Sequence, residues 1–353
     1  MFLFLKTKNT KNIYRDSLLS LSKQITDTIK NGTWTNADKI TGPVRQIVIN
    51  GMGGSNLGPE IARSIFRDEL NLPIIIDPGY DIASYINRET VYIVMSYSGS
   101  TEEPLVAYLK AKKRGALVIA VTAMGDNPMV RLALKHETPL FQFPTTANPS
   151  GQPRLGLGAA LTAFIMVLNK LEIIKKSITK ELLQSTKKLN SSGKKLADNL
   201  KSPARLMAKK IKNHEILLVS GPLFIGNLKT LRNQLCESAK NMAGYLAVSD
   251  MNHFALEGLQ YPKNNAKRLV AIFFESKLDN VKITKRLELT KEVFRKNKVL
   301  VISHKLNGAN TLEQGLELLQ FSGFLSYYLS IINQVDPMKI PWVDWFKKQL
   351  ATK

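Results

Sequence analysis

Short apolar runs alternate with amphipathic stretches along the first half of the chain. The runs are rich in Val and Ile, nearly continuous in apolar character and bounded by Gly, Pro or charged residues, as is typical of strands buried in a parallel sheet. They lie at 45–50, 72–77, 90–99 and 115–123. The stretches 58–66 and 102–115 lie between them and are predicted to be helices.

The second half repeats this order with apolar runs at 215–221, 267–274 and 297–304. Strand–helix alternation of this kind predicts parallel sheets covered by helices. The segment 145–158 is rich in Gly, Pro and Ser and is predicted to be a loop, and the helical stretch from about 159 to 210 is predicted to bridge two α/β domains. The predicted organisation is a helical extension at 1–40, a first domain at 41–200 and a second at 201–353.

The composition fits a globular enzyme-sized chain of about two domains. Of 353 residues, 44% are apolar, which supports a sizeable core. The longest apolar runs are shorter than the ~18 residues of a membrane span. The N-terminal MFLFL is too short for a signal-peptide core of about 7–15 residues. These features predict a cytoplasmic protein with no membrane association, and the single cysteine, Cys236, permits neither an intrachain disulfide nor a cysteine zinc cluster.

The net charge of +22, from 50 basic and 28 acidic residues, is compatible with nucleic-acid binding. Many of the lysines, however, are paired between 175 and 210, and residues 171–218 contain no aromatic side chain on which bases could stack. These lysines alternate with apolar residues at helical spacing, which is typical of solvated helix faces. We therefore expect no nucleic-acid partner, and expect the positive charge to favour small anionic ligands.

A glycine-rich motif, INGMGGSNLG at 49–58, follows the first predicted strand and opens a helix. Backbone N–H groups at such a junction bind anions, and glycines let a ligand approach the backbone closely. A Walker motif would need Lys and then Ser or Thr after Gly58, where Pro59 and Glu60 stand. A dinucleotide motif would need glycine at Asn56, so that interpretation is weak. The phosphate of a small sugar and a purely structural turn remain as alternatives.

A second loop, SYSGST at 96–101, also lies between a predicted strand and a predicted helix. Its four hydroxyl side chains suit a phosphate dianion, because they can donate several hydrogen bonds without a lysine. The alternative is a turn whose hydroxyls only cap the helix. Since the carboxyl ends of parallel strands meet at one edge of a sheet, we expect both loops to flank one crevice.

Together the two loops resemble the sugar isomerase (SIS) domain, a doubly wound fold that binds phosphosugars. Four further stretches are similar to the bifunctional phosphoglucose/phosphomannose isomerases, in which two SIS domains build one active site; these stretches are 150–158, 233–243, 251–259 and 336–350. The resemblance runs from about residue 45 to the C-terminus. It implies an α/β fold of two doubly wound, mainly parallel, flavodoxin-like domains linked by helices.

The resemblance also implies a role for particular residues. An aldose–ketose isomerase must open a sugar ring, move a proton between C1 and C2 and hold the enediolate formed in between. The resemblance places the catalytic base at Glu237 and ring opening at His253, a residue type that exchanges protons near neutral pH. It assigns Arg154 to the enediolate anion and Lys347 to the sugar near the reacting carbons. The phosphate and sugar are expected to contact Gly53, Gly54, Ser55, Ser96, Ser98 and Thr101.

In relatives the counterpart of His253 reaches the site from the neighbouring subunit, which implies a homodimer with shared active sites and a small phosphosugar as substrate. The four histidines of the chain do not fall at zinc-binding spacing, and proton transfer through an enediol needs no cofactor, so neither metal nor cofactor is expected. Two other classes of protein share SIS domains. A regulator that only senses phosphosugars would not need Glu237, His253 and Arg154 together, and an amidotransferase-type synthase would need a glutaminase domain for which this chain has no motif.

One position departs from the family pattern. Relatives typically carry threonine immediately before the proline of the C-terminal motif, where this chain has Ile340 before Pro341. In the family this threonine shapes the space around C1 and C2, the atoms at which glucose and mannose 6-phosphates differ. Isoleucine has no hydroxyl and more bulk, so we predict that mannose 6-phosphate is the weaker substrate. The alternative is that Ile340 only packs beside Trp342.

Overall fold

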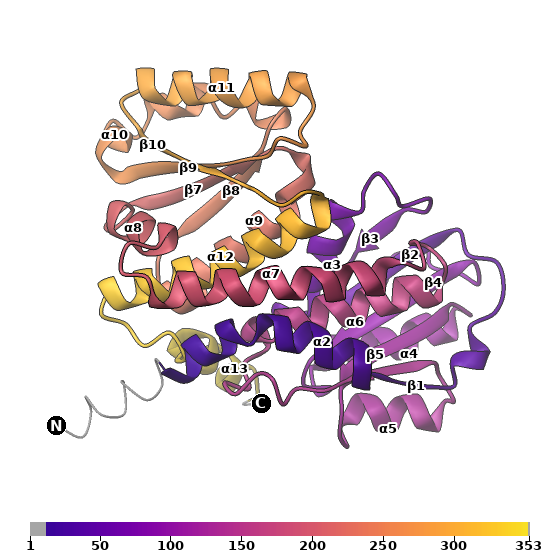
Figure 1. The fold of residues 1–353 in the computed structure, drawn as a ribbon. Helices are drawn as coiled ribbons and strands as arrows, with labels where there is room; N and C mark the ends of the chain where they lie inside the picture. Colours follow the sequence, from indigo (N-terminus) through magenta and orange to yellow (C-terminus); the bar gives the residue numbers. More distant parts are fainter. Residues whose placement is uncertain (1–11, 352–353) are drawn as a thin grey trace. The chain divides into compact units, whose positions relative to one another are not determined.

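The computed structural model describes residues 12–351 of the chain (Figure 1). The chain divides into two compact units. One is formed by Ser20–Asn190, and the other joins Met1–Leu19 to Ser191–Lys353. The predicted domain limits, after residues 40 and 200, stay a prediction.

The unit Ser20–Asn190 is built around a six-stranded sheet in the order β1-β6-β5-β4-β2-β3, in which every neighbouring pair is parallel except β1 with β6. Its strands are β1 (Thr33–Thr35), β2 (Gln46–Gly51), β3 (Ile74–Ile76), β4 (Thr90–Ser96), β5 (Leu117–Ala123) and β6 (Leu140–Phe143). Its helices are α2 (Leu21–Asn31), α3 (Gly54–Ile65), α4 (Glu102–Lys113), α5 (Pro128–Lys135), α6 (Leu157–Lys170) and the first part of α7 (Ile178–Asp198), with short 3-10 turns η1 (Ala37–Lys39) and η2 (Pro153–Leu155).

Both faces of this sheet are buried, as the nearly continuous apolar strands predict. Val48, Tyr92 and Val118 belong to one cluster that packs with α4 and α5. The neighbouring Ile47 and Val91 point to the opposite face because strand side chains alternate, and both are fully buried. The four strands predicted in this half are present.

The sequence pattern missed β1, β6 and β8, which have three, four and five residues. Each is too short to show a period. β1 and β8 also lie at sheet edges, where part of the strand faces solvent and needs no continuous apolar run.

The second unit contains a four-stranded, fully parallel sheet in the order β10-β9-β7-β8. Its strands are β7 (Glu215–Ser220), β8 (Ala243–Ala247), β9 (Leu269–Glu275) and β10 (Leu300–Lys305). Its helices are α8 (Pro203–Lys210), α9 (Ile225–Ala239), α10 (Asn265–Arg268), α11 (Val281–Lys296), α12 (Thr311–Ile332) and α13 (Pro341–Ala351), with turns η3 (Pro222–Phe224), η4 (Asp250–His253) and η5 (Glu257–Gln260). All three strands predicted in this half are present.

In this unit α11 packs on the sheet through Leu287 and Phe294, and the ring of Phe294 meets that of Phe273 edge-on at 5.8 Å. α12 is buried along most of its length and packs with α8 and α9. The sheets follow the strand order 2-1-3-4 of a doubly wound fold, which confirms the predicted flavodoxin-like α/β architecture. In the described part of the chain, no helix combines the length and apolar character needed to cross a membrane.

The N-terminal extension contributes to the core of this second unit. Residues 12–19 are helical, whereas residues 1–11, which include the MFLFL run, lie outside the described residues. Tyr14 is fully buried, its hydroxyl donates to Ser238 Oγ at 2.9 Å, and its ring stacks on Tyr327 with 5.7 Å between centroids.

The helical stretch predicted at about 159–210 is divided into three helices, α6, α7 and α8. Between α6 and α7, Glu172 has a φ of +57°, a left-handed conformation that a helix cannot continue through. Pro203 is the first residue of α8, a position that proline favours because its missing N–H is not needed there.

Candidate active site

The two predicted ligand loops leave neighbouring strands at the same edge of the six-stranded sheet. β2 pairs with β4 in parallel, with Gly51 beside Met95, so the loops that lead into α3 and α4 follow adjacent carboxyl ends. The strand order reverses at this point, which is where doubly wound sheets bind ligands. Ser55 connects the loops, because its Oγ accepts a hydrogen bond from the backbone N–H of Tyr97 at 3.0 Å.

The glycines of the first loop are needed for two different reasons. Gly53 has a φ of +50°, and a side chain there would meet no other atom. At Gly54 an added Cβ would lie 3.1 Å from the backbone nitrogen of Arg154, and at Gly58 it would lie 2.8 Å from the nitrogen of Leu161. Gly53 therefore presents backbone to open space, whereas Gly54 and Gly58 allow another part of the chain to pack closely.

The hydroxyls of the second loop differ in their surroundings. Ser96 is buried, and its Oγ donates to Thr101 Oγ1 at 3.1 Å. Ser98 is exposed, and its Oγ accepts from the hydroxyl of Ser100 at 3.0 Å. Thr101 stands at the N-cap of α4 but makes no side-chain capping bond. Ser98 Oγ also accepts from the backbone N–H of Ser100 at 3.3 Å, so a hydroxyl-rich turn with a purely structural role stays an alternative.

Arg154 lies in η2, the turn between the 145–158 loop and α6. Its side chain is buried, and Nη1 donates to Gln152 Oε1 at 2.8 Å. Pro153 of the same turn and Ser98 line one cavity of about 360 Å³, so the structure brings the hydroxyl loop and the turn of Arg154 together. The other lining residues are Tyr97, Ala123, Met124, Asp126, Asn127, Thr145, Asn148 and Gly151.

Two asparagines of this cavity were not predicted as site residues. Asn148 Nδ2 donates to the hydroxyl of Tyr97 at 3.0 Å and to the carbonyl of Gln152 at 2.9 Å, which fixes the turn against the hydroxyl loop. Burial raises the pKa of Tyr97, so its phenol stays neutral at physiological pH. Asn127 caps α5 by accepting from the N–H of Val130 at 3.1 Å. Both asparagines precede a proline, which signals a turn but not a ligand.

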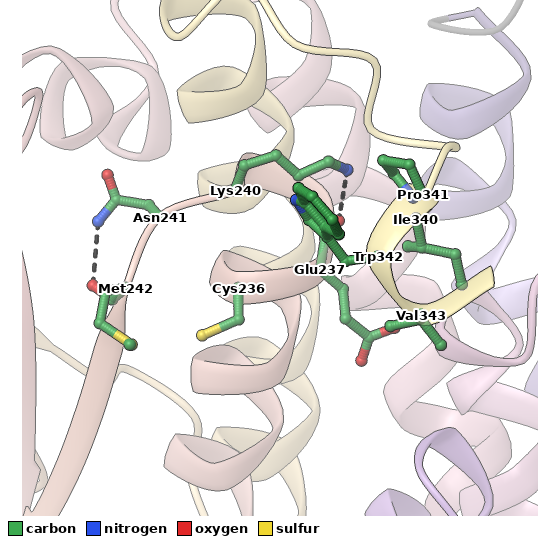
Figure 2. Close-up of a pocket in the computed structure, with 9 residues that line it drawn as sticks. All are labelled: Cys236, Glu237, Lys240, Asn241, Met242, Ile340, Pro341, Trp342 and Val343. Atoms are coloured by element: carbon green, nitrogen blue, oxygen red, sulfur yellow. Dashed lines mark hydrogen bonds between the residues drawn. The ribbon is translucent and has the colours of Figure 1, made fainter. Parts of the chain in front are cut away.

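Glu237 lies in the last turn of α9 and lines a cavity of about 550 Å³ (Figure 2). Figure 2 shows its carboxylate beside Val343 at the beginning of α13, whereas the thiol of Cys236 points away from it. Among the described residues that line the cavity, Glu237 is the only acid. The others are Cys236, Lys240, Asn241, Met242, Ile340, Pro341, Trp342 and Val343. An acid at the C-terminal end of a helix faces the negative end of the helix dipole, so helix stability does not explain this residue.

The segment that leads into α13 forms the other side of this cavity. Ile340 is half-buried, and its carbonyl accepts from the N–H of Asp344 at 3.0 Å, so it occupies the N-cap position of α13. The structure thus brings Ile340 into the Glu237 cavity. Lys347 lies further along α13, is exposed, and is not among the residues that line the cavity.

His253 ends the 3-10 turn η4, is exposed, and also lies outside the lining of the Glu237 cavity. The predicted residues are therefore divided between the two units. Ser20–Asn190 holds the two loops and Arg154, and the second unit holds Glu237, His253, Ile340 and Lys347.

Comparisons with known proteins agree with this two-unit arrangement. The sequence profile of the SIS domain matches residues 43–146, and that of the bacterial phospho-glucose isomerase C-terminal SIS domain matches residues 200–350. Two relatives are named bifunctional phosphoglucose/phosphomannose isomerase. The protein from Caldicellulosiruptor bescii is 26% identical over 342 residues, which cover 95% of this chain and 98% of the relative. The protein from Thermoplasma volcanium is 27% identical over 311 residues, which cover 88% and 93%. The chain is thus similar over most of its length to the bifunctional phosphoglucose/phosphomannose isomerases.

Solved structures that are similar to this chain confirm the fold. Tagatose-6-phosphate ketose/aldose isomerase from Escherichia coli aligns with a TM-score of 0.67 at 12% identity, covering 94% of this chain and 96% of that one. Glucosamine-6-phosphate deaminase from Thermotoga maritima aligns with a TM-score of 0.64 at 15% identity, covering 94% and 97%. At these identities the likeness extends to the fold alone.

Proposed function

We propose that the protein is an aldose–ketose isomerase that interconverts glucose 6-phosphate, and more weakly mannose 6-phosphate, with fructose 6-phosphate through a cis-enediol. The observation that carries this proposal is the Glu237 carboxylate, which lines a cavity together with Ile340 and Trp342 in a chain similar to the bifunctional phosphoglucose/phosphomannose isomerases. A single carboxylate is the group that a proton transfer between C1 and C2 requires.

Each remaining step of the reaction has a candidate residue. His253 exchanges the proton of ring opening, Glu237 moves the proton between the two carbons, and Arg154 stabilises the enediolate anion. Lys347 contacts the sugar near the reacting carbons. The first loop, through Gly53, Gly54 and Ser55, and the second loop, through Ser96, Ser98 and Thr101, bind the phosphate and sugar. The support for these roles is the similarity to bifunctional phosphoglucose/phosphomannose isomerases, the residue types and, for the loops, their position at the point where the strand order reverses.

We also propose that the protein works as a homodimer in the cytoplasm, with His253 supplied to each site by the neighbouring subunit. The support is the exposure of His253 and its place outside the lining of the Glu237 cavity. An exposed imidazole on one subunit can complete a site on another.

The test is a coupled assay with glucose 6-phosphate, mannose 6-phosphate and fructose 6-phosphate, before and after exhaustive chelation. We expect turnover in both conditions, since the proton shuttle needs no metal. Glu237→Gln should lower kcat by at least about 10²-fold while phosphosugar affinity stays nearly unchanged, because it removes the general base and keeps the shape.

The matched control is Glu292→Gln, which changes an exposed glutamate of α11 and should leave kcat unchanged. A Glu237→Gln variant within a few-fold of the wild-type kcat would contradict the assignment. Phosphosugar binding by the wild type without any turnover would instead indicate a non-catalytic regulator.

A further inference from the structure

Lys240 ends α9 in a conformation that lysine seldom adopts. It follows the last helical residue with φ +55° and ψ +34°, the left-handed region in which glycine is the usual residue at a helix end. A side chain in this region costs stability, so the surrounding structure has to hold it there.

The ammonium group of Lys240 connects two segments that are far apart in the sequence. Its Nζ donates to the carbonyl of Glu237 at 2.6 Å, to that of Asp336 at 3.0 Å and to that of Lys339 at 2.6 Å. An ammonium has three N–H donors, so these three carbonyls match its full donor set. One carbonyl belongs to the last turn of α9, and the other two belong to the segment between α12 and α13.

These bonds hold together the two sides of the Glu237 cavity. Figure 2 shows the side chain of Lys240 reaching from the end of α9 toward Pro341, with Trp342 and Glu237 beside it. The carbonyl of Lys339 belongs to the residue directly before Ile340. A shift of this carbonyl would therefore move Ile340 and the first turn of α13 relative to the Glu237 carboxylate.

We propose that Lys240 is a positioning residue, which fixes the segment 336–340 and the start of α13 against Glu237. The proposal rests on the proposed function of Glu237 as the catalytic base. Misplacement of a reacting group by about 1 Å can lower a rate by about 10²-fold. The hydrogen bonds of Lys240 therefore matter for the rate even though Lys240 does not act on the substrate.

Three variants test the hydrogen bonds of Lys240 without relying on a destabilised fold. Lys240→Gly removes the ammonium and also relieves the left-handed backbone, so it should fold at least as well as the wild type. Lys240→Met removes the charge but keeps the length, and Lys240→Arg keeps a charge whose planar donors fit three converging carbonyls less well. The matched control is Lys298→Gly, because Lys298 also has a positive φ, +59°, after helix α11 and is exposed.

The proposal also needs a readout that does not depend on activity. A second readout is amide hydrogen exchange in the held segment itself. The N–H of Met338 donates to Asp336 Oδ1 at 2.9 Å, and that of Asp344 donates to the carbonyl of Ile340 at 3.0 Å, so release of the 336–340 segment should weaken both bonds. In Lys240→Gly and Lys240→Met we expect these two amide protons to exchange several-fold faster. We also expect kcat to fall by about tenfold or more, with KM for fructose 6-phosphate within about threefold of the wild type, since the phosphate loops lie in the other unit. Lys240→Arg should give intermediate values of the exchange rates and of kcat, and Lys298→Gly should change neither.

Wild-type kcat in Lys240→Gly would overturn the proposal, whether or not the two amides exchange faster. Unchanged exchange rates in both Lys240→Gly and Lys240→Met would overturn it as well. A wild-type protein without isomerase activity would overturn the proposed function instead, and the exchange rates would still report whether Lys240 holds the segment.

Discussion

Ser96 and Ser98 stand two residues apart in one loop, yet their hydroxyls have different surroundings. Ser96 is buried and bonded to Thr101, whereas Ser98 is exposed and lines the cavity of about 360 Å³ beside Pro153. Of the two, Ser98 is the hydroxyl that a phosphate can reach without any rearrangement of the loop.

We therefore expect Ser98→Ala to raise KM for fructose 6-phosphate by about 10- to 100-fold with little change in kcat, because a charge-assisted hydrogen bond to a dianion contributes roughly 1.5–3 kcal/mol. Steady-state kinetics with fructose 6-phosphate measure both constants. Ser191→Ala is the control, since it removes an exposed hydroxyl of α7 that belongs to neither loop. Equal KM values for the two variants would show that the phosphate binds elsewhere.

Residue types at the candidate site could be predicted from the sequence, but their burial could not. Glycines and hydroxyls after two strands predict an anion site on local chemistry alone. Gly54 lacks a side chain because the backbone of Arg154, a hundred residues away in the sequence, lies against it. The hydrogen bond from Asn148 to Tyr97 likewise joins residues that are 51 positions apart. No local pattern contains such contacts.

At the scale of the element, α13 begins with a residue that caps helices poorly. Ile340 occupies the N-cap position, where serine, threonine, asparagine and aspartate are preferred because their oxygen accepts from the first free N–H groups. The threonine of relatives can therefore serve the helix as well as the sugar. These two roles predict different outcomes for the same substitution.

Ile340→Thr should stabilise α13 by about 1 kcal/mol if the new hydroxyl caps the helix, which slower amide hydrogen exchange over 342–350 would measure. If Ile340 also limits the space around C1 and C2, the same variant should raise kcat/KM for mannose 6-phosphate relative to glucose 6-phosphate by about two- to tenfold. If amide exchange over 342–350 becomes slower but the ratio of the two kcat/KM values does not change, the threonine acts only as a helix cap. Equal turnover of both aldoses by the wild type would contradict the predicted specificity.

Strands were predictable where a continuous apolar run lies between turn residues. The strands β2, β3, β4, β5, β7, β9 and β10 all follow such runs, and β3 does so although it has only three residues. The missed strands β1, β6 and β8 are short as well, and the division of 159–210 into three helices depends on single residues such as Glu172 and Pro203. Lys240 at the end of α9 also departs from the local rule that favours glycine there, and the reason is its tertiary contact with the 336–339 segment.

For the whole molecule, one buried carboxyl makes stability depend on pH. Asp279 follows β9 and packs against Gly221, where an added Cβ would lie 2.3 Å from Asp279 Oδ1. Burial raises the pKa of Asp279 to about 6, although a backbone hydrogen bond at Ser276 acts in the opposite direction. The unfolded value is about 3.9, so the folded state binds the proton more tightly. This group therefore favours folding below about pH 4, and that contribution is lost as pH rises through about 6.

Asp279→Asn should remove this loss of stability at higher pH, because the amide keeps the shape of the side chain and carries no charge. We expect the variant to be more stable than the wild type at pH 7.5 by about 1 kcal/mol, a value reduced for partial solvent screening, which corresponds to roughly 2–4 °C in Tm. Thermal unfolding of both proteins at pH 7.5 and pH 4.5 measures the difference, which should shrink at the lower pH. An identical pH dependence for the two proteins would show that Asp279 does not titrate in this range.

The last prediction concerns how many chains build one site. If His253 serves the neighbouring subunit, then Glu237→Gln and His253→Ala are each inactive alone but complement each other in a mixed dimer. One site of that dimer carries both substitutions, and the other carries neither, because a two-fold axis pairs Glu237 of one chain with His253 of the other. Random exchange of equal amounts makes about half of the dimers mixed, so activity should recover to about a quarter of the wild-type level. Each variant taken through the same exchange by itself is the control, and two affinity tags with size-exclusion chromatography verify that mixed dimers form. Within a single chain the same residues would leave one substitution in every site, so mixed dimers without recovered activity would place His253 in its own subunit's site.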